Sequence, residues 1–472
     1  MIEDESTTRA RRRTPAARAV ALLTAFALAV TPTVAVAPTT AGAQSLPPGL
    51  PVIRDAEIEQ LLRDYTQPIL RAAGLAQQKI QVVIINDRSF NAFVVDATRI
   101  FINAGALLDA KVPNEVIGVL AHETGHIAGG HLSRLRQQLA QAQVASIIAM
   151  ILGIGAAVAA RGGGDPSAAI LGPQTSIQRS LLSYQRAQEE QADRGGVKFL
   201  AATGQSAKGM YDTFKRLSDQ ILFAAHNADP YMQSHPMPAE RVAALEVIAK
   251  NSPNWDKKDP PELQLRHDMM RAKLSGFLDR ADTVARRYPA TDTSLPARYA
   301  RAISTYRHGD QRVAVNQIDG LIQSEPNNPY FYELKGQVLL ESGHPAEALA
   351  PLHRAIQLAP SPALIQVLLA QALNASNAPK TADEAVSLLR TALAREPESV
   401  DGYTQLAMAY GRKGDLAQAD LASAMAAYMR GDHATARQLA ARSKARFPVG
   451  SPGWVKADDI VSSKSATGPG QR

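Results

Sequence analysis

The C-terminal half of the chain carries a regular spacing of glycine and proline that few folds can accommodate. In three Gly–Pro pairs the two residues are 17 positions apart, and the first two pairs are offset by 34 positions: Gly309 and Pro326, Gly343 and Pro360, and Gly431 and Pro448. Both residue types interrupt helices, so each interval has room for one helix and its turn. The spacing therefore predicts a stack of helical hairpins.

Small residues inside this period support the same arrangement. They recur at one position in the first helix of each hairpin and at one in the second: Ala302, Gly336, Ala370 and Ala407, then Ala314, Ala348, Ala385, Ala419 and Ala436. A 34-residue period is that of the tetratricopeptide repeat (TPR). We predict an all-α TPR solenoid over residues 256–456, with a degenerate first hairpin near Gly276 and Ala281 and three extra residues in the loop 374–381. An unrelated helical bundle is the alternative.

The first 43 residues have the order of features found in a secretory signal peptide. Five arginines between Arg9 and Arg18 precede an apolar stretch at 19–30, and Ala41-Gly42-Ala43 offers small residues for cleavage. A transmembrane anchor is the alternative, but the apolar stretch is shorter than the roughly 20 residues that cross a bilayer. We therefore expect export of a mature chain that begins at Gln44.

Residues 44–255 are predicted to form a mainly helical α+β domain with a small sheet. Helical periodicity covers 56–73 and 174–200, Val- and Ile-rich β-like runs cover 79–85 and 99–103, and Pro113 provides the start of another helix. The uncharged stretch 144–159 is too short to span a bilayer. It either packs inside the domain or faces a membrane surface or a substrate. Residues 457–472 are predicted to be a flexible tail.

The predicted helix that starts at Pro113 contains His122-Glu123-Thr124-Gly125-His126. Histidines four residues apart project from one face of a helix, so His122 and His126 can bind one zinc ion. Glu123 lies about 100° further round the helix, where it can reach a water on the metal without ligating the metal. A purely structural role would require a buried, unpaired glutamate in an apolar helix, which is rare.

A site of this zincin type needs a third protein ligand, and the chain contains no cysteine to supply it. The metzincin pattern fails, because its final histidine position holds Leu132 and His131 comes one residue early. The segment Glu189-Glu190-Gln191-Ala192-Asp193 offers a gluzincin-like alternative. On a helix, Glu189 and Asp193 share one face, so Glu189 can ligate zinc while Asp193 orients a ligand imidazole. Glu190 is the main competitor for the ligand role.

These motifs together resemble a known family. The H-E-x-x-H and E-x-x-A-D segments, with Asn91-Ala92-Phe93 upstream and His235-Pro236 and Arg241 downstream, resemble the zinc metallopeptidases that include HtpX and the CAAX prenyl proteases. Members of those two branches have evident transmembrane helices, whereas the mature chain has none in its sequence. With a signal peptide in front and TPRs behind, the chain is most similar to soluble periplasmic members of the family.

The resemblance implies one zinc ion per chain held by His122, His126 and Glu189, with Glu123 as the catalytic residue and Asp193 in support. It also implies that an extended polypeptide substrate pairs with an edge strand beside the active-site helix. The candidate strand is Arg99, Ile100, Phe101, Ile102 and Asn103. Partners implied for the TPR domain are the outer-membrane β-barrel assembly machinery and its stalled substrates.

His235 precedes two prolines at Pro236 and Pro238 and is therefore expected in a rigid loop. Three roles are open: it approaches the zinc in a resting state, it is a structural histidine, or it supports the transition state. Arg241 is expected to brace this loop. His131 is expected to be a structural polar residue rather than a ligand.

The sequence therefore predicts an exported, periplasmic zinc endopeptidase that acts on unfolded or misassembled envelope proteins. The competing hypothesis is a TPR chaperone or scaffold for outer-membrane assembly with incidental proteolysis. The net charge of +7 is spread without a long Lys/Arg run, which argues against nucleic-acid binding. Peripheral contact with a membrane is compatible with either hypothesis.

Overall fold

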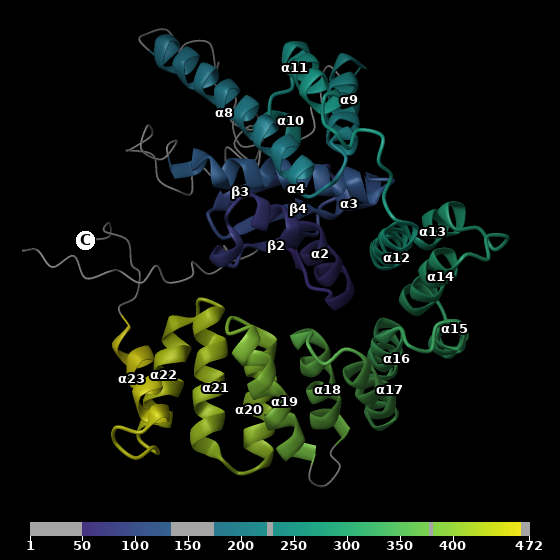
Figure 1. Ribbon diagram of the computed structural model, residues 1–472. Helices are drawn as coiled ribbons and strands as arrows, with labels where there is room; N and C mark the ends of the chain where they lie inside the picture. The colour runs from purple at the N-terminus through teal and green to yellow at the C-terminus, as the bar shows by residue number, and fades with distance from the viewer. Residues whose placement is uncertain (1–49, 134–173, 224–229, 377–380, 464–472) are drawn as a thin grey trace, which may run out of the picture. The chain divides into compact units, whose positions relative to one another are not determined.

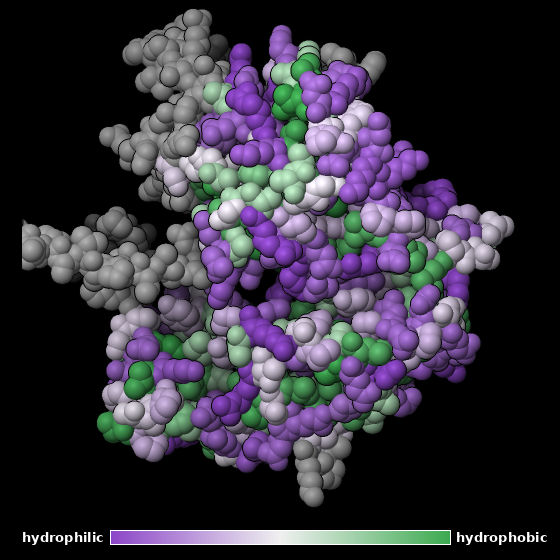
Figure 2. All heavy atoms as spheres, viewed as in Figure 1, coloured by the Kyte–Doolittle hydropathy of each residue, from purple (hydrophilic) through white to green (hydrophobic). Residues whose placement is uncertain are grey.

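The computed structural model describes residues 50–133, 174–223, 230–376 and 381–463 (Figure 1). The predicted signal peptide, the uncharged stretch 144–159 and most of the predicted tail lie outside these residues. None of the helices in the described ranges is both long enough and apolar enough to cross a bilayer. On the face shown in Figure 2, hydrophilic residues predominate over scattered apolar ones.

The domain that carries His122 and His126 contains a four-stranded sheet in the order β1-β2-β4-β3. Strands β2 (Gln81–Ile85) and β4 (Arg99–Asn103) are parallel, while β1 (Val52–Ile53) and β3 (Ala92–Asp96) pair antiparallel with β2 and β4. The two predicted strands are confirmed. The other two were missed, because a two-residue strand has no period and β3 is half-buried over its last three residues.

The prediction that Arg99–Asn103 is an edge strand for substrate is wrong. Strand β4 pairs with β2 on one side and with β3 on the other, so its backbone groups are already used. A tight turn causes this: the backbone N–H of Thr98 donates to Asp96 Oδ1 at 2.8 Å and folds β3 back against β4. Phe93 and Phe101 then stack across the two strands with ring centroids 5.2 Å apart.

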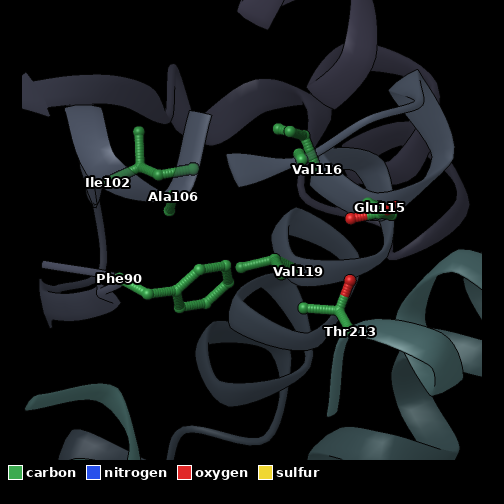
Figure 3. Close-up of a pocket in the computed structure, with 8 residues that line it drawn as sticks. Phe90, Ile102, Ala106, Glu115, Val116, Val119 and Thr213 are labelled. Carbon is green, nitrogen blue, oxygen red and sulfur yellow. The ribbon is translucent and has the colours of Figure 1, made fainter. Parts of the chain in front are cut away.

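Helix α4 (Pro113–Ala128) forms the centre of this domain, and 14 of its 16 residues are buried. Its Val116 and Val119 face Ile102 of β4, together with Phe90 and Ala106 (Figure 3). A helix that is buried on every side must be enclosed by neighbours. Helix α4 directly contacts strands β3 and β4 and helices α2 (Ala56–Ala72), α8 (Gln174–Ala202), α9 (Lys208–Phe223) and α12 (Pro261–Leu278). The same domain also contains α3 (Ala104–Asp109), α10 (Pro230–Ser234) and α11 (Ala239–Lys250).

Glycines let α8 and α9 lie directly on α4. A Cβ atom added to Gly125 would lie 2.7 Å from the carbonyl oxygen of Ala192 on α8. One added to Gly118 would lie 2.6 Å from the Cβ of Met210 on α9. Since real Cβ atoms do not approach other atoms so closely, both positions require glycine. The close contact of α4 with α8 is what brings Glu189 and Asp193 to the two motif histidines.

The remaining helices form successive antiparallel pairs, as the glycine–proline spacing predicted. From α16 to α23 they stand side by side in sequence order (Figure 1). The helices are α12 (Pro261–Leu278), α13 (Ala281–Arg287), α14 (Leu295–His308), α15 (Gln311–Ser324), α16 (Pro329–Glu341), α17 (Pro345–Leu358), α18 (Ala363–Ser376), α19 (Thr381–Arg395), α20 (Val400–Arg412), α21 (Leu416–Met429), α22 (His433–Lys444) and α23 (Pro452–Ser462).

Two kinds of glycine are needed in these hairpins. Gly343 and Gly431 each have φ = 81° in the turn between two helices, a conformation that strongly favours glycine. Gly336 lies within a helix, and a Cβ there would come 2.3 Å from Leu352 Cγ of the paired helix. Ala407 and Ala419 are only partly buried, unlike the other alanines of the pattern. Helix α23 runs to Ser462, past the expected end of the repeats at residue 456.

Candidate metal centre

One turn of α4 places the two motif histidines side by side. The Nε2 atoms of His122 and His126 lie 3.1 Å apart, and both side chains are buried. Their Nδ1 atoms have other neighbours, Asp193 for His122 and His131 for His126. Both imidazoles therefore present the same nitrogen to one common point.

Helix α8 brings a carboxylate to that point. Glu189 Oε2 lies 3.3 Å from His122 Nε2, and Glu189 Oε1 lies 3.4 Å from His126 Nε2. His235, from the loop between α10 and α11, adds an imidazole whose Nδ1 is 3.0 Å from Glu189 Oε2. One ligand atom from each of these four residues lies within 4.8 Å of the others. We call His122, His126, Glu189 and His235 the metal-ligand cluster.

The chemistry of this cluster fits a divalent metal ion such as zinc. Imidazole nitrogen and carboxylate oxygen are the ligand atoms that zinc takes in the absence of cysteine. Burial lowers the pKa of His126 to about 3, so its imidazole is neutral, the form that ligates metals. Burial opposes charge on His122 as well, but the Asp193 and Glu189 carboxylates outweigh it and raise its pKa to about 9. The two carboxylates therefore favour positive charge at His122.

Asp193 and Arg241 contact residues of the cluster and hold them in place. Asp193 Oδ1 lies 2.9 Å from His122 Nδ1, a close polar contact off the line of a regular hydrogen bond. Arg241 Nη1 lies 2.9 Å from Glu189 Oε2 and also donates to the carbonyl oxygen of Pro236 at 2.9 Å. Burial would raise the pKa of Asp193, but the Arg241 guanidinium outweighs burial and keeps that pKa low.

Glu123 lies beside the cluster without joining it. Its side chain is fully buried, and neither carboxylate oxygen has a hydrogen-bond partner among the described residues. The atom of the cluster that approaches it is His235 Nε2, at 3.6 Å from Glu123 Oε1. Burial raises the pKa of Glu123 above its ordinary value. A buried carboxyl group without a hydrogen-bond partner is costly, so its presence here requires an explanation other than packing.

The loop that carries His235 is held on both sides. The His235 backbone N–H donates to the Tyr231 carbonyl oxygen at 2.7 Å, and the two rings stack with centroids 4.6 Å apart. Arg241 donates to the next residue in the loop, Pro236. These contacts place His235 within the metal-ligand cluster, and its role there stays a prediction.

The sequence did not predict the position of His131. Its Nδ1 lies 3.0 Å from His126 Nδ1, so it contacts a cluster residue from outside the cluster. The sequence feature that could have predicted this contact is the Gly129-Gly130 pair, which ends α4 and allows the chain to fold back. Glu190 has an exposed side chain that pairs with Arg194, which removes it from competition for the ligand role.

Comparisons with known proteins agree with this site. Residues 53–249 match the family model described as Peptidase family M48. A putative beta-barrel assembly-enhancing protease of Vibrio cholerae is 26% identical over 290 residues, which cover 60% of this chain and 59% of that protein. Beta-barrel assembly-enhancing proteases of Yersinia pestis and Escherichia coli K12 are each 22% identical, over 85% and 76% of this chain and 82% and 73% of their own lengths.

Solved structures resemble the chain only weakly. The crystal structure of MamA has a TM-score of 0.28 at 17% identity and covers 34% of this chain and 90% of its own. YrrB, described as a TPR protein with an unusual peptide-binding site, has a TM-score of 0.28 at 17% identity and covers 48% and 97%. The assignment of the helical repeats therefore rests on the helix pairs themselves. Residues 53–249 are therefore similar to peptidase family M48, and their metal-ligand cluster fits a metalloprotease.

Proposed function

We propose that this chain, whose residues 53–249 are similar to peptidase family M48, is an exported zinc-dependent endopeptidase that cleaves unfolded or misassembled envelope proteins. The observation that carries the proposal is Glu123, a buried carboxylate beside the metal-ligand cluster whose two oxygens have no hydrogen-bond partner among the described residues. A structural zinc site needs only ligands, whereas a hydrolytic site also needs a proton acceptor next to the metal.

In this proposal His122, His126 and Glu189 hold the metal. A zinc ion held there would supply Lewis acidity, which polarises a carbonyl group and acidifies water. Glu123 accepts a proton from the attacking water at its free carboxylate and returns it to the leaving amine. Asp193 keeps His122 oriented, and Arg241 holds Asp193 and Glu189 in place.

His235 belongs to a resting state in this proposal. Its ring stands within 3.6 Å of both Glu189 and Glu123, so it occupies space that a scissile peptide needs. Its loop contains no helix, and Tyr231 and Arg241 hold it through a few contacts. We infer that a substrate displaces His235 from the cluster, which would couple cleavage to the arrival of a client.

The architecture and the names of the relatives support a client class and partners. The relatives are named for enhancement of β-barrel assembly, and repeats of paired helices typically present an extended binding surface. We propose that the TPR helices recruit envelope proteins or the outer-membrane β-barrel assembly machinery. Export would depend on the predicted signal peptide at residues 1–43, and would place the enzyme in the periplasm.

The decisive experiment compares purified wild-type protein with Glu123→Gln. We expect both to contain one zinc ion per chain by elemental analysis, and only the wild type to cleave an unfolded protein, with a loss of about 10²-fold or more in the variant. Glu190→Gln, in an exposed carboxylate close to the site, is the matched control and should cleave normally. Equal cleavage by wild type and Glu123→Gln would contradict the proposed mechanism.

The same variant separates the protease from a TPR chaperone or scaffold. In a deletion strain, the scaffold hypothesis predicts that Glu123→Gln restores the envelope fully. The endopeptidase hypothesis predicts that misassembled envelope proteins are not degraded in the strain that carries the variant. Complete rescue would therefore limit proteolysis to a side activity.

A further inference from the structure

The backbone after α4 is built to return one side chain to the end of that helix. Gly130 has φ = 62°, a left-handed conformation that strongly favours glycine, and it reverses the chain directly after the helix ends at Ala128. A Cβ atom on Gly129 would lie 2.2 Å from Nε2 of His131, so the His131 ring lies over Gly129. Both glycines therefore serve the placement of a buried imidazole.

That imidazole bridges the metal-ligand cluster and α8. His131 Nδ1 lies 3.0 Å from His126 Nδ1, and His131 Nε2 lies 3.1 Å from the Gln191 side-chain oxygen. His131 is only 2% exposed, and its ring meets the His126 ring edge to face at a centroid distance of 5.0 Å. The two nitrogens of one ring are thus occupied by a ligand histidine and by a neutral amide.

One placement of the hydrogens along these contacts leaves His126 able to bind a metal. The amide oxygen of Gln191 can only accept, so His131 Nε2 carries a hydrogen and donates it. The other nitrogen of a neutral imidazole must then accept, so His131 Nδ1 takes a hydrogen bond from Nδ1–H of His126. His126 Nε2 is left with its lone pair pointing at His122 and Glu189.

The opposite assignment would prevent metal binding. If the Gln191 amide donated instead, His131 would donate from Nδ1, and His126 would carry its hydrogen on Nε2. A protonated Nε2 has no lone pair for a metal. Only the first assignment leaves His126 able to act as a ligand.

We propose that His131 is a positioning residue for the metal site, which accepts the Nδ1–H of His126 and is itself held by Gln191. The inference rests on the proposed metal site and adds two residues to it. His122 has a carboxylate at its Nδ1, the usual partner of a metal-bound histidine, whereas His126 has a neutral imidazole. Loss of such a partner typically costs about 10- to 100-fold in metal affinity.

The test measures zinc affinity by competition with a chelator on the full mature chain, at one pH. His131→Leu should weaken zinc binding about 10- to 100-fold. His131→Asn should retain most of the affinity. The Asn Oδ1 atom is bonded to Cγ, as His131 Nδ1 is, so it can accept the same hydrogen bond. His267→Leu is the matched control: His267 is fully buried and hydrogen-bonded at both nitrogens, but to Tyr65 and Ala110. It should lower the unfolding midpoint of the metal-free protein and leave zinc affinity unchanged.

Gln191 gives a second test in which folding is not at risk, because its position on α8 is exposed. Gln191→Glu keeps an acceptor and should bind zinc within a few-fold of wild type, whereas Gln191→Leu should bind more weakly. The inference is overturned if folded His131→Leu binds zinc as tightly as wild type, or if His131→Asn loses as much affinity as His131→Leu. Absence of zinc binding in the wild type would instead contradict the proposed function.

Discussion

Arg241 binds Asp193 through two parallel hydrogen bonds, 2.7 Å from Nε to Oδ2 and 2.8 Å from Nη2 to Oδ1. Both side chains are 4% exposed, so the pair is desolvated. The third guanidinium nitrogen of Arg241, Nη1, contacts Glu189, so one guanidinium neutralises two buried carboxylates. The pair joins α11 to α8 directly behind the metal-ligand cluster.

Replacement of Arg241 by methionine should destabilise the metal-free protein strongly. The change leaves Asp193 and Glu189 without their cation, and removal of one partner from a buried ion pair typically costs about 3–5 kcal/mol. Denaturant unfolding measures the change. Arg194→Met is the control, because the Arg194–Glu190 pair on the same helix is exposed and should contribute less than about 1 kcal/mol. Similar losses in both variants would show that burial of the Arg241 pair has no energetic consequence.

His235→Ala should increase cleavage of an unfolded protein by the zinc-loaded enzyme several-fold. The reason is that the imidazole competes with substrate for the space between Glu189 and Glu123. The electronic spectrum of the Co²⁺-substituted protein should change as well, since a nitrogen near the metal position is removed. His344→Ala, an exposed histidine in the turn before α17, should change neither quantity. If cleavage and spectrum both stay as in the wild type, His235 does not cap the site.

The sequence predicted those parts of the site that depend on local periodicity. His122, His126, Glu123 and the pair Glu189 and Asp193 lie on two helices, and helical spacing alone determines which of these side chains share a face. Their roles as ligands, base and support remain predictions. The repeat hairpins were predictable for the same reason, because Gly343 and Gly431 mark turns within a local pattern.

Features that depend on distant pairing were not predictable. The order of the sheet places β4 inside rather than at an edge, and this results from a turn at Asp96 and Thr98 that composition does not reveal. The contact of His131 with His126 depends on the left-handed Gly130 and on Gln191 from another helix. Helix α12 contributes Met270 to the core of the first domain and Met269 to that of the repeats, so the junction near residue 256 has no sharp signal in the sequence.

Gly125→Ala should weaken both stability and zinc binding. The added methyl group would lie 2.7 Å from the Ala192 carbonyl oxygen, so α8 would have to move away from α4, and Glu189 would move with it. Overpacking of this kind typically costs about 1–3 kcal/mol. Gly411→Ala is the control, because Gly411 lies in helix α20 with no atom within 4 Å of the added carbon. That variant should be as stable as wild type or up to about 1 kcal/mol more stable. Unchanged zinc affinity in Gly125→Ala would show that the helix spacing does not set the ligand geometry.

A buried charge cluster lies at the start of α2. Lys273 of α12 is 5% exposed, and its Nζ lies 2.8 Å from Asp55 Oδ2, 3.2 Å from Glu57 Oε2 and 4.0 Å from Glu333 Oε2. Tyr299 donates a hydrogen bond to Glu57, but Glu333 Oε2 has no hydrogen-bond partner among the described residues. One ammonium therefore faces three carboxylates, and Glu333 is the least compensated.

Burial raises the pKa of Glu333 to about 8, and the nearby carboxylates oppose its ionisation further. The folded protein therefore binds this proton more tightly than the unfolded chain does. The stabilising effect of this proton on the folded protein is complete below the ordinary glutamate pKa of about 4.3. It is lost as the pH rises to about 8, at no more than about 1.4 kcal/mol per pH unit.

Glu333→Gln cannot ionise, so its free energy of unfolding should fall less than that of wild type between pH 5 and pH 8. Denaturant unfolding of the metal-free proteins measures this, with exposed Glu325→Gln as the control that should follow wild type. Parallel pH profiles for wild type and Glu333→Gln would show that Glu333 is already ionised in the folded protein at pH 5.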